Sequence, residues 1–315
     1  MRAVWSYWST PYRVHRRSTW ASDLHHLLSW VLSVETARQH YTETALVTDD
    51  EGARMLVDGL GLRFTDVSTE LNALHDHDPA WWSIGKIYAY RLQTKPFIHI
   101  DSDVYLWKRL SPLLESADVF AQNEEPFRIY EDRYYPGHFE REAHATPGTW
   151  IPREWLWYRS SGRPQRAFCC GILGGNRVDF LRYYAAVSIH LLQHPANRSC
   201  WMRLRNICSC LLFEQYLLSA CVEYHQERRG SPFPNIGVDC LFDGANSGYR
   251  MQRAAEAGYT HLLGDAKRDP RISRLLEQRV MRQYPAYYDR CVRYLENRTS
   301  TGLSGEITSR TQKGA

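Results

Sequence analysis

Residues 95–107 read Lys95-Pro-Phe-Ile-His-Ile-Asp-Ser-Asp-Val-Tyr-Leu-Trp107. The apolar run from Phe97 to Ile100 predicts a buried strand, and two carboxylates one residue apart, Asp101 and Asp103, follow at its end. Buried charges are costly unless a partner compensates them. A divalent cation would do so, and oxygen ligands suit Mg²⁺ or Mn²⁺. Because ligands of open α/β sheets bind at the carboxyl ends of strands, this stretch predicts a metal and diphosphate site for a nucleotide-linked substrate.

Apolar residues on both sides of the Asp-x-Asp pair distinguish it from the solvated turns in which such pairs are common. Val104-Tyr-Leu-Trp107 follows the pair directly, whereas polar residues would border a surface turn. One alternative stays open from the residues alone. The two aspartates could simply end a strand and cap a helix that starts near Ser111-Pro112.

The overall composition is that of a globular chain. Its 315 residues form one large domain or two small ones and can bury a substantial core. A net charge of +4 is too small, without clustering, to indicate nucleic-acid binding. No apolar run approaches ~18 residues, so we expect no membrane span. The chain begins with a strand-like segment and no signal peptide, and we therefore expect a cytoplasmic protein.

The cysteines favour a structural interpretation. The chain has 8 of them, and none forms a Cys-x-x-Cys pair. Cys208-x-Cys210 has no second half at zinc-ligand spacing. Many of the cysteines lie in apolar surroundings, so we expect small buried thiols.

The first half of the chain alternates strand and helix patterns. The expected strands are residues 2–8, 44–48, 62–67, 96–100 and 118–122, and the expected helices are residues 24–40, 51–60 and 81–92. Gly61 would end the second of these helices. Strands that alternate with helices of this length predict βαβ units and a mostly parallel sheet.

The second half is expected to complete one catalytic domain over residues 1–295. Residues 123–166 contain prolines, aromatics and charges without a sustained helical period, and we expect an insertion that acts as a lid or acceptor wall. Residues 168–176 predict a strand and turn. The further expected helices are residues 178–193, with Asn176 as N-cap, 211–222 and 268–294. The composition of residues 296–315 predicts a disordered tail.

Several motifs then stand in a recognisable order. They are Ser83-Ile-Gly-Lys86-Ile-Tyr-Ala-Tyr90, Ile98-His-Ile-Asp101-Ser-Asp103-Val104, Phe168-Cys-Cys-Gly171-Ile-Leu-Gly174-Gly175-Asn176, Glu214-Gln215 and His261-Leu-Leu-Gly264-Asp-Ala-Lys267. In this order the chain resembles nucleotide-sugar-dependent glycosyltransferases of the GT-A fold, particularly the glycogenin-like and galactosyltransferase-like family 8 type. The chain departs from the family pattern where Glu214 replaces an aspartate and Cys169-Cys170 replaces a polar pair.

The resemblance implies a GT-A fold, which is α/β and Rossmann-like with a mostly parallel sheet flanked by helices. It also implies a hexosyltransferase-like enzyme that moves a sugar, with retention, from a nucleotide-diphosphate sugar. A UDP-sugar is the first choice of donor, and the acceptor, whether glycan, peptide or small molecule, is not indicated. The cofactor would be Mn²⁺ or Mg²⁺.

The resemblance further assigns roles to single residues. The metal ligands would be Asp101, Asp103 and His261, with Asp101 also near the donor ribose. The donor-binding residues would be Lys86, Asp101, Gly174, Gly175, Gly264 and Lys267, and the catalytic residues would be Glu214 and Lys267. Uridine contacts would be expected at Asp49 and Asp50.

Each role has a structural alternative. Lys86 could be a solvated helix lysine, Glu214 could form a structural salt bridge, and Asp49 could cap a helix. Gly174-Gly175 could be an ordinary loop before a helix. His75-Asp-His77-Asp78 looks like a metal cluster, but we interpret it as a loop.

Two other functions compete with glycosyl transfer. Asp101-Ser-Asp103 together with Gly264-Asp265-Ala-Lys-Arg-Asp269 also matches a HAD-type phosphatase, with Asp101 as nucleophile. Three βα units before the first motif argue against it. The other alternative is a non-catalytic sugar-nucleotide-binding module.

Overall fold

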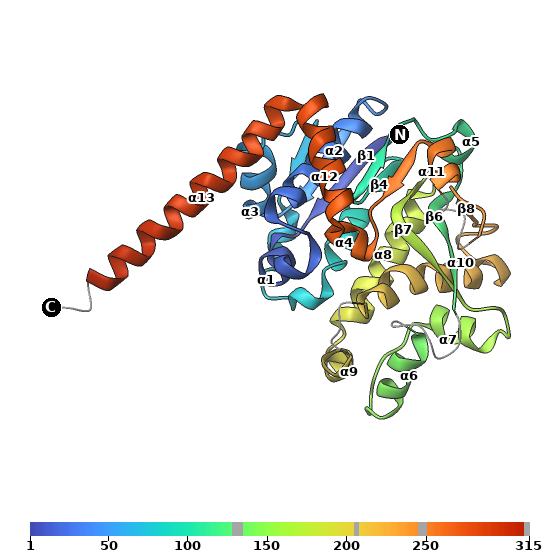
Figure 1. The fold of residues 1–315 in the computed structure, drawn as a ribbon. Helices are drawn as coiled ribbons and strands as arrows, with labels where there is room; N and C mark the ends of the chain where they lie inside the picture. The colour runs from blue at the N-terminus through green and yellow to red at the C-terminus, as the bar shows by residue number, and fades with distance from the viewer. Residues whose placement is uncertain (128–134, 205–207, 245–250, 312–315) are drawn as a thin grey trace.

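The computed structural model describes residues 1–127, 135–204, 208–244 and 251–311, without the side chains of residues 15–18 and 299–311 (Figure 1). The strands are β1 (Arg2–Tyr7), β2 (Thr44–Thr48), β3 (Asp66–Ser68), β4 (Phe97–Ile100), β5 (Val104–Leu106), β6 (Val119–Pro126), β7 (Arg166–Gly175), β8 (Val238–Cys240) and β9 (Tyr259–His261).

The α-helices are α1 (Ser9–Thr19), α2 (Asp23–Arg38), α3 (Asp50–Ala53), α4 (Ile84–Leu92), α5 (Pro112–Glu115), α6 (Pro136–His144), α7 (Arg153–Ser160), α8 (Val178–Gln193), α9 (Arg198–Arg203), α10 (Leu217–Glu227), α11 (Met251–Ala257), α12 (Pro270–Gln283) and α13 (Pro285–Thr311). The π-helical segments are η1 (Arg54–Gly59) and η5 (Leu212–Tyr216). The 3-10 segments are η2 (Glu70–Leu74), η3 (Pro79–Trp81), η4 (Pro195–Asn197) and η7 (Gly264–Arg268).

Seven strands form the main sheet in the order β3-β2-β1-β4-β7-β6-β8. Neighbouring strands from β3 to β4 are parallel, β7 is antiparallel to both β4 and β6, and β8 is parallel to β6. The predicted α/β class with a mostly parallel sheet is therefore confirmed. The carboxyl ends of β2, β1 and β4 meet at one edge of the sheet, which is where the Asp-x-Asp turn begins.

Helices cover both faces of this sheet (Figure 1). Successive side chains of a strand point to opposite faces, and β1 follows this rule. Trp5 packs in the core cluster that contains α2 and α12 residues, whereas Val4 packs in the cluster that contains α4, α8 and α10 residues. The inner strands β2, β1, β4 and β7 are almost entirely buried, which explains their nearly continuous apolar sequences, whereas the edge strands β3 and β8 are not buried.

A second, two-stranded sheet lies beyond the end of β4. Strand β5 follows the Asp-x-Asp turn and pairs antiparallel with β9, so that Val104 stands opposite His261. This pairing brings a segment about 160 residues further along the chain next to the turn. The antiparallel pair is thus the element that delivers the late His-x-x-Gly-x-x-Lys motif to the early Asp-x-Asp motif.

Most predicted elements have the expected type, with shifted ends. Helix α8 has the predicted bounds. Strand β3 covers residues 66–68 instead of 62–67. Asn176 is not the N-cap of α8, because its side-chain amide donates to the backbone carbonyls of Glu115 and Ala117 and Arg177 takes the cap position.

The segment of residues 123–166 differs most from expectation. Its ends extend the β6–β7 hairpin, and it contains two helices, α6 and α7. Phe139, Trp155 and Tyr158 of these helices are fully buried. These side chains make the segment part of the core, although a motion of it remains a prediction. The part at residues 128–134 lies outside the described residues.

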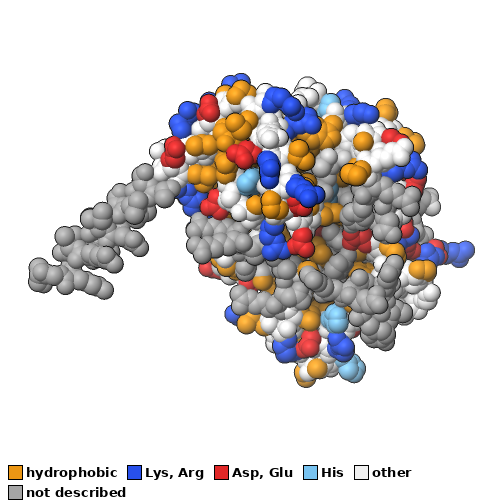
Figure 2. Space-filling model, viewed as in Figure 1, with side chains coloured by type: hydrophobic (Ala, Val, Ile, Leu, Met, Phe, Trp, Pro, Cys, Tyr) orange, Lys and Arg blue, Asp and Glu red, His pale blue; other side chains and the backbone are white. Residues whose placement is uncertain are grey.

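Two further features concern the ends and the surface. Helix α13 continues to Thr311 and leads away from the body of the molecule (Figure 1). Disorder of residues 296–315 stays a prediction. Figure 2 shows Lys and Arg side chains interspersed with Asp and Glu on the visible face. Within the described residues, no helix combines the length and apolar character needed to cross a membrane.

The close packing of β7 against β4 yields a stability prediction. A Cβ atom on Gly174 would lie 2.0 Å from the backbone oxygen of Phe97, whereas one on Gly237 would meet nothing nearer than 3.9 Å. We expect Gly174→Ala to lower the free energy of unfolding by at least about 2 kcal/mol because the strands must move apart. Gly237→Ala should change it by less than about 0.5 kcal/mol. Urea unfolding of both variants tests this, and equal effects would contradict it.

Candidate active site

The Asp-x-Asp pair lies on the short turn between β4 and β5, and two serines of helix α2 donate hydrogen bonds to the backbone of this turn. Ser33 donates its hydroxyl hydrogen to the backbone oxygen of Asp101 at 3.1 Å, and Ser29 donates to that of Ser102 at 2.7 Å. The two serines stand four residues apart and therefore share one face of the helix. Their hydroxyls satisfy buried carbonyls of the turn and so fix its backbone.

Lys86 of α4 connects the turn to a second buried carboxylate. Its ammonium nitrogen lies 3.0 Å from Asp101 Oδ2, 2.5 Å from Glu214 Oε1 and 3.1 Å from the backbone oxygen of Cys170. An ammonium group has three hydrogens to donate, and these three acceptors use all of them. Lys86 thus lies beside Asp101 and is not a solvated helix lysine.

The charges of this group depend on one another. Burial disfavours the charged form of Lys86, but Asp101 and Glu214 outweigh it and hold the pKa of Lys86 well above its usual value. Burial raises the pKa of Asp101 and of Glu214, and Lys86 opposes the rise in both. The side chain of Glu214 has no exposed surface, so Glu214 acts on its surroundings through Lys86.

Asp103 has a different set of partners. Lys267 Nζ lies 2.5 Å from Asp103 Oδ2, and His261 Nε2 lies 3.4 Å from Asp103 Oδ1. Burial would raise the pKa of Asp103, but Lys267 and His261 outweigh it and hold this pKa well below its usual range. Lys267 also lies over the ring of Trp20, 5.6 Å from its centroid. Asp103 is therefore an ionised carboxylate that faces the late motif.

Asp101, Asp103 and His261 together form a candidate cation site. One potential ligand atom from each lies within 4.8 Å of the others, and within the described residues they form the one cluster of this kind. The ligand atoms of an octahedral Mg²⁺ lie about 2.1 Å from the ion, which puts neighbouring ligands about 3 Å apart. Two carboxylates and an imidazole suit Mg²⁺ or Mn²⁺, so the residues fit the cofactor that the sequence implies.

Gln122 and Gly171 complete the surroundings of His261. Gln122 Oε1 lies 2.7 Å from His261 Nδ1 and accepts a hydrogen bond from the Tyr259 hydroxyl at 2.6 Å. A Cβ atom on Gly171 would lie 2.5 Å from both Gln122 Oε1 and His261 Nδ1. Sequence reasoning did not identify Gln122, because one polar residue in a strand carries no pattern of its own.

The glycines predicted to bind the donor divide into two groups. Gly264 has a φ of +50°, where glycine is favoured, and begins the η7 segment that carries Lys267. Gly174 and Gly175 pair with Ile98 and Phe97 at the start of β4, about 10–13 Å along the strand from Asp101. The structure therefore does not bring Gly174 and Gly175 to the site; their role is close strand packing.

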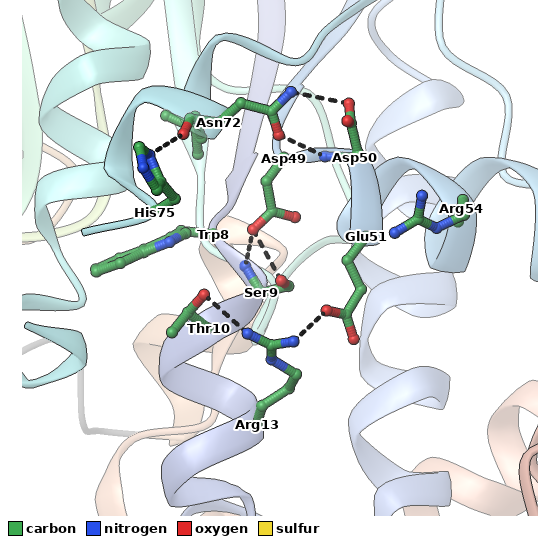
Figure 3. A pocket seen from close by; sticks show the side chains of 11 residues that line it. Trp8, Ser9, Thr10, Arg13, Asp49, Asp50, Glu51, Arg54, Asn72 and His75 are labelled. Atoms are coloured by element: carbon green, nitrogen blue, oxygen red, sulfur yellow. Dashed lines mark hydrogen bonds and ion pairs between the residues drawn. The ribbon is translucent and has the colours of Figure 1, made fainter. Parts of the chain in front are cut away.

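An open pocket of about 200 Å³ lies at the carboxyl ends of β1 and β2, along the same sheet edge as the turn (Figure 3). Asp49 accepts hydrogen bonds from the Gly52 and Ser9 backbone nitrogens and from the Ser9 hydroxyl, which supports its capping role. Asp50 bonds to Asn72. Arg13 and Glu51 form an ion pair on the opposite wall.

The two aspartates of the second phosphatase motif are engaged away from the Asp-x-Asp turn. Asp269 caps α12 by accepting hydrogen bonds from the backbone nitrogens of Arg271 and Ile272. Asp265 is 91% exposed and pairs with Arg268. The second phosphatase motif therefore does not contribute a carboxylate beside Asp101. His75 and His77 likewise form no part of the cation cluster.

The chain is thus an α/β protein with two aspartates, a histidine and two lysines gathered at the carboxyl edge of its sheet. It belongs to a family of unknown function, DUF6734, whose model matches residues 1–294. No curated protein matches its sequence.

Solved structures similar to the chain include the galactosyltransferase LgtC in complex with donor and acceptor sugar analogs, at 15% identity over 68% of this chain and 70% of that one, with a TM-score of 0.35. Mouse xyloside xylosyltransferase 1 in its apo form is similar at 12% identity over 82% and 92%, with a TM-score of 0.38. An active-site mutant of LgtC is similar at 14% identity over 83% of this chain and 86% of that one, with a TM-score of 0.37. The family assignment itself comes from the match over residues 1–294.

The pairing of Lys86 with Glu214 gives a second prediction. Lys86→Met leaves two buried carboxylates without their cation, so we expect the free energy of unfolding to fall by about 3–5 kcal/mol. Adding Glu214→Gln to Lys86→Met should restore part of the lost free energy of unfolding. The control Lys95→Met, at an exposed position, should have little effect. A double-mutant cycle by urea unfolding measures the coupling.

The pH dependence of these variants has a defined sign. A carboxyl whose pKa is higher in the folded than in the unfolded state binds a proton on folding, so its folding is favoured as pH falls. The pKa of Glu214 is already raised by burial and should rise further without Lys86. The difference in the free energy of unfolding between Lys86→Met and Lys86→Met/Glu214→Gln should therefore become smaller from about pH 8 to about pH 5, because Glu214 becomes protonated and then resembles glutamine. A difference in the free energy of unfolding that stays the same over this pH range would contradict the pairing of Lys86 with an ionised Glu214.

Proposed function

We propose that this protein is a metal-dependent glycosyltransferase that moves a sugar from a nucleotide-diphosphate sugar to an acceptor. The observation that carries the proposal is the cluster of Asp101, Asp103 and His261, with Lys86 and Lys267 each paired to one of the two aspartates. The motif order of the sequence supports the same class.

The charge of the cluster supports a divalent cation with an anionic ligand. Three carboxylates, of Asp101, Asp103 and Glu214, and two ammonium groups, of Lys86 and Lys267, leave one negative charge when His261 is neutral. A divalent cation turns this into one positive charge. A buried site of that charge favours an anion such as a diphosphate.

The side chains have separate tasks in this proposal. When bound, the cation would neutralise the charge that develops on the departing diphosphate. Asp101, Asp103 and His261 would hold it, and Lys86 keeps the Asp101 carboxylate oriented. Lys267 would leave Asp103 for a phosphate oxygen, to which an ammonium is a suitable point charge.

The identity of the donor and the stereochemistry are the finer parts of the proposal. We infer a UDP-sugar, with the nucleoside directed to the pocket at the ends of β1 and β2 and the diphosphate to the turn. Glu214 is fully buried and pairs with Lys86, so its carboxylate is not available as a base to deprotonate an acceptor. That is consistent with retention, in which Glu214 supports Lys86 and does not touch the sugar.

The direct test is incubation of the protein with a panel of nucleotide sugars, with and without Mn²⁺. We expect release of free nucleoside diphosphate that depends on Mn²⁺ and is lost in Asp103→Asn, because one ligand is removed. Asp265→Asn, at an exposed position near the same motif, is the matched control. Release of inorganic phosphate from phosphate esters would favour a phosphatase, and tight binding without release would favour a binding module.

The role of Lys267 is testable by binding alone. We expect Lys267→Ala to weaken binding of a nucleoside diphosphate by ~1–3 kcal/mol, the range of a hydrogen bond to a charged group. Binding of the nucleoside should be nearly unchanged. Lys108→Ala, at an exposed position, serves as control. Calorimetry measures the affinities of the wild-type protein and both variants for the two ligands, and equal weakening of nucleoside and nucleoside diphosphate in Lys267→Ala would exclude the contact.

A further inference from the structure

The side chain of Gln122 takes part in a hydrogen-bond chain whose direction is determined. Asn123 Nδ2 donates to the backbone oxygen of Glu124 at 3.0 Å, and Gln122 Nε2 donates to Asn123 Oδ1 at 3.0 Å. A backbone carbonyl can only accept, so the amide nitrogen of Asn123 must face it. The amide oxygen of Asn123 then faces Gln122, and Gln122 must present its own nitrogen there. The oxygen of Gln122 is consequently directed to the other side.

On that side Gln122 Oε1 meets two donors. It accepts from the Tyr259 hydroxyl at 2.6 Å and lies 2.7 Å from His261 Nδ1. Because this oxygen can only accept, His261 Nδ1 must carry the proton. In a neutral imidazole the other nitrogen, Nε2, then has a lone pair. That nitrogen faces Asp103 Oδ1 at 3.4 Å, and a lone pair opposite a carboxylate is unfavourable until a cation or a second proton lies between them.

Two local features bring the side chain of Gln122 to this position, a β-bulge in β6 and a glycine in β7. The register of β6 against β7 shifts between Ala121 and Asn123, and bulges of this kind redirect a side chain. The path of the redirected side chain crosses Gly171, where any Cβ would collide with both Gln122 Oε1 and His261 Nδ1. Gln122 is 1% exposed and Asn123 is fully buried, so water does not compete for these groups.

We propose that Gln122 is a positioning residue that holds His261 with its proton on Nδ1 and so presents Nε2 to a divalent cation. The inference rests on the metal site of the proposed function. Partners that fix the tautomer of a metal-binding histidine contribute about 10- to 100-fold in affinity. Gln122, Asn123 and Gly171 therefore form a supporting unit for one ligand.

The tautomer is measurable in the metal-free protein. Long-range ¹H–¹⁵N correlations of ¹⁵N-histidine-labelled protein at about pH 8.5, two units above the ordinary histidine pKa, distinguish the two forms. The His261 signals are identified by their loss in His261→Asn. We expect a protonated Nδ1 and an unprotonated Nε2. A wild-type protein with the proton on Nε2 overturns the proposal.

Calorimetric titration with Mn²⁺ alone tests the consequence. Gln122→Met removes the amide acceptor at similar size and should weaken Mn²⁺ binding about 10- to 100-fold, with the proton moving to Nε2. Gln122→Glu keeps an acceptor toward His261 and should keep the proton on Nδ1, although it loses the hydrogen bond to Asn123 Oδ1. Gln93→Met, at a buried glutamine whose side chain donates to the backbone oxygen of Ala89, should bind Mn²⁺ with wild-type affinity.

The outcomes separate this inference from the proposed function. Wild-type affinity in Gln122→Met overturns the role of Gln122, and so does a His261 proton on Nε2 in Gln122→Glu. If Gln122→Met does not fold, the wild-type spectrum and Gln122→Glu still decide. If the wild-type protein binds no Mn²⁺ at all, the proposed metal site fails, while the spectrum decides the tautomer independently.

Discussion

Asp101 and Asp103 are two carboxylates on one buried turn, and their negative charges repel each other. The structure depends on the positively charged side chains that compensate them. Asp101 and Asp103 stand at the end of an apolar strand, where the low dielectric strengthens every charge interaction. Lys86 compensates the first, and Lys267 compensates the second. In the proposed function, the remaining excess of negative charge, contributed by Glu214 behind Lys86, would favour binding of a further cation.

The compensating groups come from segments that are far apart in the sequence, so the fold must bring them together. Helix α4 supplies Lys86 from one side of the turn. On the other side, the β5–β9 pairing supplies His261, and Gly264 allows the chain to turn so that Lys267 follows within one short segment. The same sheet edge continues into the pocket at the ends of β1 and β2. Metal, diphosphate and nucleoside would thus lie side by side in the proposed enzyme.

How far the sequence predicts this structure depends on the type of signal. Apolar periodicity predicted the strand before Asp101 and the helix over residues 178–193. The placement of His261 beside the turn came only from motif spacing, because a contact across so many residues leaves no local pattern. Gly174 was assigned to the donor site through the family resemblance, with a loop before a helix as the alternative. Its close packing against β4 depends on the neighbouring strand, which the local sequence does not indicate. Gln122 was missed because its contact with His261 depends on a bulge and on the absence of a side chain at Gly171 in the adjacent strand.

The most direct measurement of the central claim is an anomalous-scattering experiment on crystals grown with Mn²⁺ and a nucleoside diphosphate. Our account predicts a manganese peak bounded by Asp101, Asp103 and His261, with the diphosphate in contact with it and with Lys267, and the nucleoside toward the pocket of β1 and β2. A nucleotide bound elsewhere, or at this turn without manganese, would contradict it.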